Sequence, residues 1–418
     1  MIRLRIKNFG PIKTGLIEND GWIDFSRVTI FVGNQGSGKS SIAKLFSTFS
    51  WIEKALVRGD YEKKWFERKN RLKNQSLNYH RLDHYFYPQG LNTTEIEYQG
   101  EAFSMKYTQG QLVISENKTD AYHLPQVMYV PAERNFIAYV RNARELKLSS
   151  DSLKEFLTEF DNAKLNMKGV LHLPINGVEL EYDKLNDLIN IRDKNYRLRL
   201  TDASSGFQSL VPLFLVSQNL AKTVKAQSED NARPMSADEV DRFKRGVENI
   251  FNNKALTEEQ QRVAISVLSA RFNKTAFINI VEEPEQNLFP NSQWEVLKCL
   301  LEFNNQTAHN RLIITTHSPY IINFMSIAVQ GMNLMKKIQS IQPPNRALLT
   351  RLEAIISRDA LVAAEDLSIY QLDELTGSIV KLPAFEGIPT DRNFLNDTLR
   401  KGNAQFDELL AIEEELQA

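Results

Sequence analysis

The chain has 418 residues, a quarter of them charged, and a formal net charge of −1 at pH 7. This composition is ordinary for a soluble globular protein, and the balanced charge excludes recognition of nucleic acid or an anionic membrane by a uniformly basic surface. The single cysteine, Cys299, excludes a disulfide framework and a cysteine-based metal site. No apolar run reaches the roughly 18 residues of a membrane span, and the N-terminus lacks the apolar core of a signal peptide. We therefore expect a cytoplasmic protein without membrane contact.

The first motif in the chain is FVGNQGSGKSS, residues 31–41, which contains the spacing G-x-x-x-x-G-K-[ST]. Glycines at this spacing let backbone N–H groups surround a polyphosphate, while the lysine reaches its β/γ end and the next serine faces Mg²⁺. The preceding RVTIFV predicts a buried strand, and Ile42, Leu45, Phe46 and Phe49 predict one face of a following helix. These flanks argue against a flexible glycine-rich turn. The candidate phosphate-binding residues are Gly33, Asn34, Gly36, Ser37, Gly38, Lys39, Ser40 and Ser41.

A basic stretch follows this predicted helix. It contains Lys63, Lys64, Arg68, Lys69 and Arg71, with Trp65 and Phe66 between them. A solvated helix face is the simpler interpretation, and a contact with nucleic acid or with an acidic partner is the alternative.

Between residues 79 and 130 the sequence predicts an antiparallel β region. Glycine and glutamine separate short runs such as TEIEY, AFSMKY and QLVIS, and QVMYVPAER adds a strand that ends at Pro131. The mostly polar residues that follow, to about residue 195, predict helices. Residues 208–272 predict further helices, starting with the apolar QSLVPLFLVSQNLAKTV, and we interpret them as a helical insertion.

Two acidic residues follow a second buried strand, in AFINIVEEPEQNLFP. Residues 276–281 form the near-continuous apolar run of a central parallel strand, and ligands gather at the carboxyl ends of such strands. We expect Glu282 to hold the Mg²⁺ shell and Glu283 to polarise an attacking water. Glu285 is expected to be structural or interfacial, and an acidic turn without a metal is the simpler alternative for the whole segment.

Two further segments present polar groups at the ends of predicted elements. His317 ends a strand in NRLIITTHSPYII, where its imidazole could hydrogen-bond a γ-phosphate or the attacking water, although a lone histidine is often incidental. In LTDASSGFQSLVPLF, Ser204, Ser205 and Gly206 precede an apolar helix, so hydroxyls and N–H groups gather at its N-terminus. This second segment could also be a simple N-cap.

The C-terminal residues 341–418 predict an α/β extension. They contain a helix, the strands LSIYQLDE and GSIVKLP, and an acidic final helix. The carboxylates of DLSIYQLDE are typical of exposed turn residues, and no D-x-D metal site on a strand is present there.

The order of these motifs resembles that of ABC-type ATPases of the SMC, RecF and OLD kind. The segments that carry the likeness are IRLRIKNFGPIK, GNQGSGKSS, YVPAERN, SSGFQSL, IVEEPEQNLFP and TTHSPY. The likeness covers residues 1 to about 330 and is greatest for compact ATPases without a coiled coil that belong to bacterial defence systems. It implies an α/β fold in which residues 1–340 form an ABC-type P-loop ATPase head with a mixed sheet.

The resemblance also implies how the candidate residues act. Each ATP, with its Mg²⁺, would be held by the 33–41 loop of one chain and covered by residues 204–206 of a second chain, in a homodimer or a higher homo-oligomer. Lys39, Glu283 and His317 would be catalytic residues, with Glu283 driving hydrolysis and His317 sensing the γ-phosphate.

Three positions depart from the family pattern. Glu282 stands where an aspartate is usual, and the usual glutamine after the YVP strand is absent. Glu133 in that turn is our candidate for the missing metal contact, beside Ser40 and Glu282. SSGFQ matches the LSGGQ signature loosely, which leaves the choice between Ser204 and Ser205 open.

The resemblance favours an ATP-hydrolysing dimeric switch that controls a separate effector protein, such as a nuclease or toxin, in anti-phage defence. OLD-type relatives carry a nuclease domain after the ATPase, whereas residues 341–418 show no such metal site. The alternative is a RecF- or RecN-like ATPase of DNA repair that contacts DNA through the basic stretch. Salt-sensitive, ATP-dependent DNA binding that is lost when this stretch is neutralised would favour the alternative.

Overall fold

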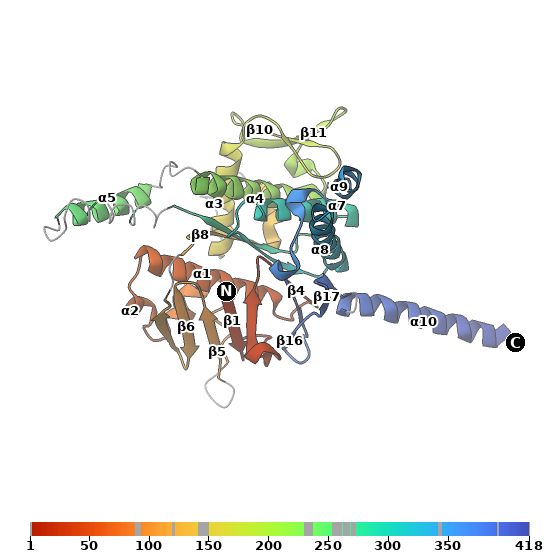
Figure 1. Ribbon diagram of the computed structural model, residues 1–418, viewed down its shortest axis with the longest axis horizontal. Helices are drawn as coiled ribbons and strands as arrows, with labels where there is room; N and C mark the ends of the chain where they lie inside the picture. The colour runs from red at the N-terminus through yellow and green to blue at the C-terminus, as the bar shows by residue number, and fades with distance from the viewer. Residues whose placement is uncertain are drawn as a thin grey trace.

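The computed structural model describes residues 2–87, 93–118, 122–140, 150–229, 237–252, 261, 268, 273–341, 345–390 and 393–417. A seven-stranded sheet has helices on both faces, and a five-stranded antiparallel sheet covers one of those helices (Figure 1). This mixed α/β architecture confirms the fold class predicted from the sequence.

The central sheet consists of β2 (Gly15–Leu16), β4 (Val28–Gly33), β8 (Pro125–Val130), β13 (Ala276–Glu282), β14 (Arg311–Thr316), β15 (Leu367–Leu372) and β16 (Ser378–Lys381). Its order is β2-β16-β15-β4-β14-β13-β8; β15, β4, β14, β13 and β8 are parallel, and β16 is antiparallel to β15. Every residue of β4 and β13 is buried, as their continuous apolar runs predict. Thr315 of β14 pairs with both Glu282 and Phe31, so the carboxyl ends of the three motif-bearing strands meet at one edge.

The antiparallel sheet has the order β3-β1-β5-β6-β7. Its strands are β1 (Ile2–Lys7), β3 (Trp22–Phe25), β5 (Glu95–Gln99), β6 (Phe103–Thr108) and β7 (Gln111–Glu116). The predicted antiparallel strands between residues 79 and 115 are therefore present. The last predicted strand of the 79–130 region, β8, instead joins the parallel central sheet beside β13.

Helix α1 (Lys39–Arg58) lies between the two sheets, where Phe46 stacks on Phe25 and Phe49 stacks on Tyr98. The helices that share the other hydrophobic core are α3 (Asp151–Asn166), α4 (Ser205–Glu229), α7 (Pro290–Asn304) and α8 (Pro319–Gln339). Shorter or outlying helices are α2 (Lys63–Phe66), α5 (Ala237–Asn252), α9 (Arg346–Glu353) and α10 (Phe394–Gln417). The helix after the glycine-rich loop is thus buried on two sides, and its apolar face is set by the sequence pattern.

Residues 171–199 form a small antiparallel sheet, which corrects the helical prediction for the region up to residue 195. Its order is β12-β11-β10-β9, with β9 (Leu171–His172), β10 (Glu179–Asp183), β11 (Leu188–Arg192) and β12 (Arg197–Arg199). Turns with positive φ at Asn176, Gly177 and Asp187 separate these strands. The strands are short and half exposed, so their polar composition hides the alternation that would have identified them.

The C-terminal strands complete the central sheet. β15 pairs with β4 along its whole length, so the predicted boundary at residue 340 runs through one sheet. A two-stranded ribbon of β17 (Ala384–Phe385) and β18 (Ile388–Pro389) follows, and α10 extends away from the body (Figure 1). The two strands expected near the C-terminus are confirmed, but their place is inside the main fold.

The segment 208–272, predicted to be one helical insertion, contains a helix in the core and a helix outside it. Most of α4 is buried against the central sheet, whereas α5 lies outside the core (Figure 1). Residues 230–236, 253–260, 262–267 and 269–272 lie outside the described residues. Among the helices that the structure describes, none is long and apolar enough to cross a membrane.

Candidate active site

The glycine-rich loop connects the end of β4 to the start of α1. Gly36 and Gly38 have φ values of 74° and 100°, in the left-handed region that favours glycine. A Cβ on Gly38 would lie 2.9 Å from Cγ1 of Ile12, so a side chain there would also clash with the turn after β1. Ser37 is buried, and its hydroxyl has no hydrogen-bond partner among the described residues. The loop is therefore tightly curved, and the Ser37 hydroxyl inside it is available to a ligand.

Lys39 begins α1 and points its ammonium back over the loop. Its Nζ donates to the carbonyl oxygens of Gly33 and Asn34, at 2.9 and 2.7 Å, and lies 3.5 Å from Nδ1 of His317. Burial lowers the pKa of Lys39 to about 8, although the nearby glutamates, Glu283 foremost, act in the opposite direction. The ammonium is thus held by neutral carbonyl oxygens and surrounded by carboxylates.

Glu282 and Glu283 are adjacent in the chain but face different strands. Glu282 is 5% exposed, and its Oε2 accepts a hydrogen bond of 3.1 Å from the backbone N–H of Ala132, just after β8. The backbone of Glu283 has φ +44°, and its N–H donates to the carbonyl oxygen of Thr315 at 2.8 Å. A positive φ is uncommon outside glycine, and it turns the Glu283 side chain toward the end of β14.

His317 lies between Lys39 and Glu283. Its Nε2 is 3.3 Å from Oε1 of Glu283, and this contact with the imidazole is the main reason that the pKa of Glu283 is lowered. Lys39, His317 and Glu283 therefore form a continuous polar chain across the carboxyl ends of β4, β14 and β13. The structure brings these three predicted residues together.

Glu285 supports the backbone under this chain. Its Oε1 accepts hydrogen bonds of 2.7 Å from both Thr316 Oγ1 and the backbone N–H of His317. Burial raises the pKa of Glu285, and the two hydrogen bonds act in the opposite direction. In the described chain Glu285 thus holds the segment that carries His317.

Arg134 is a component of the site that the sequence analysis missed. It is fully buried, and its guanidinium donates to the carbonyl oxygens of Glu282 at 2.6 Å, Glu283 at 2.5 Å, Ser209 at 3.1 Å and Pro131 at 3.2 Å. Burial lowers its pKa to about 10. A single cation thus joins the ends of β8 and β13 to Ser209, one turn into α4. An arginine four residues after the end of a buried strand, in YVPAER, is the sequence signal that could have identified it.

Glu133 is exposed on the turn after β8. With Glu282 and Lys44, it lines a cavity of about 340 Å³ that also reaches Tyr129. The hydroxyl of Tyr129 and Oε1 of Glu282 are both buried without a hydrogen-bond partner among the described residues. Within those residues no three histidine, cysteine, aspartate or glutamate side chains converge, so the metal set of Ser40, Glu282 and Glu133 stays a prediction.

The serine-glycine segment forms the N-terminus of α4, with Ser204 and Ser205 exposed and Gly206 buried. A Cβ on Gly206 would lie 2.8 Å from the carbonyl oxygen of Asn287, so glycine is required for this close approach. Ser209, one turn later, donates to Gln286 at 3.3 Å and accepts from Asn287 at 3.2 Å. The segment is thus attached to the turn after β13, while its two serines face outward.

The basic stretch is only partly free. Lys63 pairs with Glu116 at 2.6 Å, and the Arg71 guanidinium lies 4.4 Å from the centre of the Trp65 ring. Lys64, Arg68 and Lys69 are exposed.

A family comparison agrees with this geometry. Residues 259–322, which contain β13, α7 and β14, match the model of the AAA ATPase domain family. A glycine-rich loop between β4 and α1, beside the acidic end of β13 in a parallel sheet, is the arrangement of a P-loop nucleotide-binding fold. The chain therefore has an α/β fold of P-loop type.

Solved structures that are similar to this chain include two SMC heads and a transporter cassette. An SMC head domain from Thermotoga maritima is 12% identical, with a TM-score of 0.34, covering 92% of this chain and 98% of that one. The Smc head of Pyrococcus furiosus with an extended coiled coil, bound to the C-terminal domain of ScpA, is 11% identical, with a TM-score of 0.33 and full coverage of both chains. A nucleotide-free ATP-binding cassette from an ABC transporter is 11% identical, with a TM-score of 0.28, covering 93% and 94%. No curated protein matches the chain in sequence.

Proposed function

We propose that the chain binds and hydrolyses Mg-ATP between two copies of itself and thereby switches a separate effector protein. The observation that carries the proposal is the polar chain of Lys39, His317 and Glu283 beside the glycine-rich loop. The same three groups, with Glu282 next to them, supply the charge and the proton acceptor that phosphoryl transfer to water requires.

The residues of the loop fit a polyphosphate and a divalent cation. The unpartnered hydroxyl of Ser37 and the left-handed backbone at Gly36 and Gly38 form a cradle at the N-terminus of α1, where N–H groups and the helix dipole favour anions. Ser40 and Glu282, with Glu133 as a third candidate, would hold Mg²⁺, because hydroxyl and carboxylate oxygens are its preferred protein ligands. When bound, Mg²⁺ supplies positive charge to the phosphate oxygens.

The other groups of the site have separate tasks. Glu283 has a lowered pKa and is a carboxylate at neutral pH, so it can orient a water molecule and accept its proton. Lys39 can give up its two carbonyl partners and donate to phosphate oxygens instead. His317 holds Glu283 in place and lies within reach of the same phosphate.

The second copy is supported by the outward-facing N-terminus of α4. Ser204 and Ser205 are exposed, while Gly206 and Ser209 fasten the helix to the turn after β13. An exposed helix N-terminus with free hydroxyls suits an anion brought by another molecule. A head-to-tail pair would place each such terminus over the loop of the other copy.

A separate effector and a role in anti-phage defence are supported by the motif order, which resembles that of compact ATPases of defence systems. The expected test is expression with the genomic neighbours, using Glu283→Gln to retain ATP. A neighbour's product that copurifies with the variant, and whose amount changes with Mg-ATP, agrees with the switch. Retention of ATP by an isolated chain, without a second copy or a partner, contradicts it.

The second candidate function is ATP-dependent DNA binding of the RecF or RecN type. The exposed Lys64, Arg68 and Lys69 favour it, since they form a local basic surface. Neutralising these three residues should weaken DNA binding and reduce its salt dependence if they contact phosphates. DNA binding that is equally strong in the neutralised variant, or absent in the unmodified chain, removes this candidate.

A further inference from the structure

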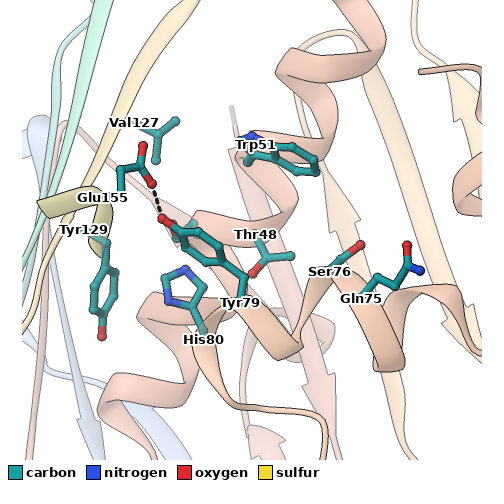
Figure 2. Close-up of a pocket in the computed structure, with 10 residues that line it drawn as sticks. Thr48, Trp51, Gln75, Ser76, Tyr79, His80, Val127, Tyr129 and Glu155 are labelled. Carbon is teal, nitrogen blue, oxygen red and sulfur yellow. Dashed lines mark hydrogen bonds between the residues drawn. The ribbon is translucent and has the colours of Figure 1, made fainter. Parts of the chain in front are cut away.

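A second cavity, of about 210 Å³, lies between the middle of α1, residues 75–80, β8 and α3 (Figure 2). Four aromatic side chains line it: Trp51 from α1, Tyr79 and His80 from the 75–80 segment, and Tyr129 from β8. None of the phosphate-binding or catalytic residues proposed above lines this cavity. It adjoins the cavity that contains Glu133 and Glu282, because His80 and Tyr129 line both.

The aromatic side chains favour a flat ligand. The ring centres of His80 and Tyr129 are 4.8 Å apart, and those of Tyr79 and His80 are 4.7 Å apart in an edge-on arrangement. Trp51 is 43% exposed and lies across from Glu155 and Tyr79, as Figure 2 shows. Aromatic groups arranged in this way offer stacking surfaces to a planar molecule.

His80 provides the observation that points to a ligand. It is 3% exposed, and neither of its ring nitrogens has a hydrogen-bond partner among the described residues. Burial lowers the pKa of His80 to about 3, so the ring is neutral and presents one donor and one acceptor. Buried polar groups are ordinarily paired, and a bound molecule would supply the missing partners.

The polar groups around the cavity define the ligand's edges. Ser47, Thr48, Gln75 and Ser76 offer hydroxyl and amide groups, and Glu155 accepts a hydrogen bond from the Tyr79 hydroxyl. Lysine and arginine are absent from the ten residues that line the cavity. A phosphorylated ligand would meet only a carboxylate there, whereas an uncharged molecule with N–H donors finds acceptors.

We propose that this cavity binds an uncharged, planar nitrogen heterocycle of nucleobase size. Since a cavity of about 150 Å³ admits benzene, the larger volume here suits one or two fused rings with polar substituents. The proposal for binding stands apart from ATP hydrolysis, because every group that it uses lies outside the nucleotide loop.

A consequence for ATP hydrolysis rests on the proposed function. Thr48 lies on α1, the helix that begins at Lys39, and Tyr129 also lines the cavity that contains Glu282. A ligand in the cavity would contact both α1 and β8. If these elements move when ATP binds, the ligand has different affinities for the ATP-free and ATP-bound forms and shifts the equilibrium between them. The bound heterocycle is thus expected to change the hydrolysis rate.

The test uses the full chain and four probes: adenine, hypoxanthine, cytosine and uracil. Binding is followed by saturation-transfer NMR, with and without a non-hydrolysable ATP analogue and Mg²⁺. At least one probe is expected to bind in both conditions. Displacement of every probe by the analogue would show binding at the nucleotide loop only and would overturn the proposal, as would the absence of binding.

Two variants locate the probe. Ser76→Phe fills the cavity and should abolish binding, whereas Asn74→Phe, in the same short helix Leu72–Ser76 but outside the cavity lining, should leave it unchanged. His80→Phe keeps an aromatic ring and removes the unpartnered nitrogens, so the folded chain should bind the probe at least tenfold more weakly. Equal binding by Ser76→Phe and Asn74→Phe contradicts the proposal. A chain that binds the probe but does not hydrolyse ATP supports this site and refutes the proposed ATPase function.

Discussion

The two glutamates at the end of β13 are neighbours in sequence, yet their surroundings differ. On the β14 side, Glu283 contacts His317, which in turn lies beside Lys39, so the chain itself completes the polar contacts. On the β8 side, one oxygen of Glu282 accepts from Ala132 and the other has no partner in the described structure, like the hydroxyl of Tyr129. The first side is organised before any ligand arrives, and the second has polar atoms that a metal ion would satisfy.

This difference indicates separate roles for the two carboxylates. The contact with His317 lowers the pKa of Glu283 and so keeps this carboxyl group ionised. Glu282, buried and half-paired, is suited to a divalent cation, since a buried carboxylate otherwise requires further partners. The buried guanidinium of Arg134 donates to the backbone carbonyl oxygens of both glutamates, so it fixes the positions of the two residues relative to each other.

The largest expected effect comes from Glu283→Gln, which removes the proton acceptor on the organised side. Hydrolysis should fall by about 10²–10⁴-fold, the usual contribution of general acid–base catalysis, while ATP binding is retained. Steady-state phosphate release and equilibrium binding of ATP measure the two quantities. Glu295→Gln, on an exposed face of α7, is the matched control. A variant that hydrolyses ATP at the control rate would remove Glu283 from the mechanism.

Arg134→Met tests the connection between the two sides. It leaves the carbonyl oxygens of Glu282, Glu283 and Ser209 without their donor, and loss of a buried charged hydrogen-bonding partner costs about 3 kcal/mol. Chemical denaturation should therefore show a markedly lower free energy of unfolding than for Arg346→Met, at an exposed position of α9. Equal midpoints for the two variants would mean that the guanidinium contributes little to the fold.

Glu282→Gln addresses the other side alone. The amide oxygen can still accept from Ala132, so the nucleotide-free chain should keep its stability. The Mg²⁺ concentration needed for half-maximal hydrolysis should rise by roughly tenfold, because a metal-binding carboxylate is lost. A titration of hydrolysis with Mg²⁺ measures this, and an unchanged midpoint would contradict a metal role for Glu282.

The smallest expected effect is a pH dependence due to Lys39. Its folded-state pKa is lowered to about 8 from an ordinary value of 10.5, so the unfolded chain binds more protons between these pH values. Its contribution to the stability of the nucleotide-free chain should therefore rise with pH in this interval, by at most about 1.4 kcal/mol per pH unit. Comparing unfolding of the unmodified chain with that of Lys39→Met isolates this contribution. A difference that stays constant across the interval would show that burial leaves the ammonium unperturbed.

Much of the fold could be predicted because its central elements follow simple patterns. The apolar runs of β4, β13 and β14 and the helical spacing of α1 come from complete burial, which leaves a clear signal in the sequence. The sheet of residues 171–199 could not be recognised, since its strands are short and half exposed. Likewise, the place of β15 beside β4 depends on pairing between distant segments, which no local pattern records.

In the site, too, some residues could be predicted from local sequence patterns and others depend on contacts between distant segments. Gly36, Gly38 and Lys39 follow from a spacing imposed by backbone conformation. The role of Arg134 depends on four carbonyl oxygens from separate segments, and the contact of His317 with Glu283 depends on a positive φ at residue 283. Contacts of this kind arise only once the strands are assembled.

The central claim, that each ATP is shared by two copies, is tested most directly by mixing two inactive variants. Lys39→Ala disables the loop and keeps the α4 terminus, whereas Ser205→Arg blocks the terminus and keeps the loop. If the site is shared, an equimolar mixture regains about a quarter of the unmodified rate, because half of the pairs are mixed and each has one intact site. A mixture no more active than the sum of its separate components would contradict the shared site.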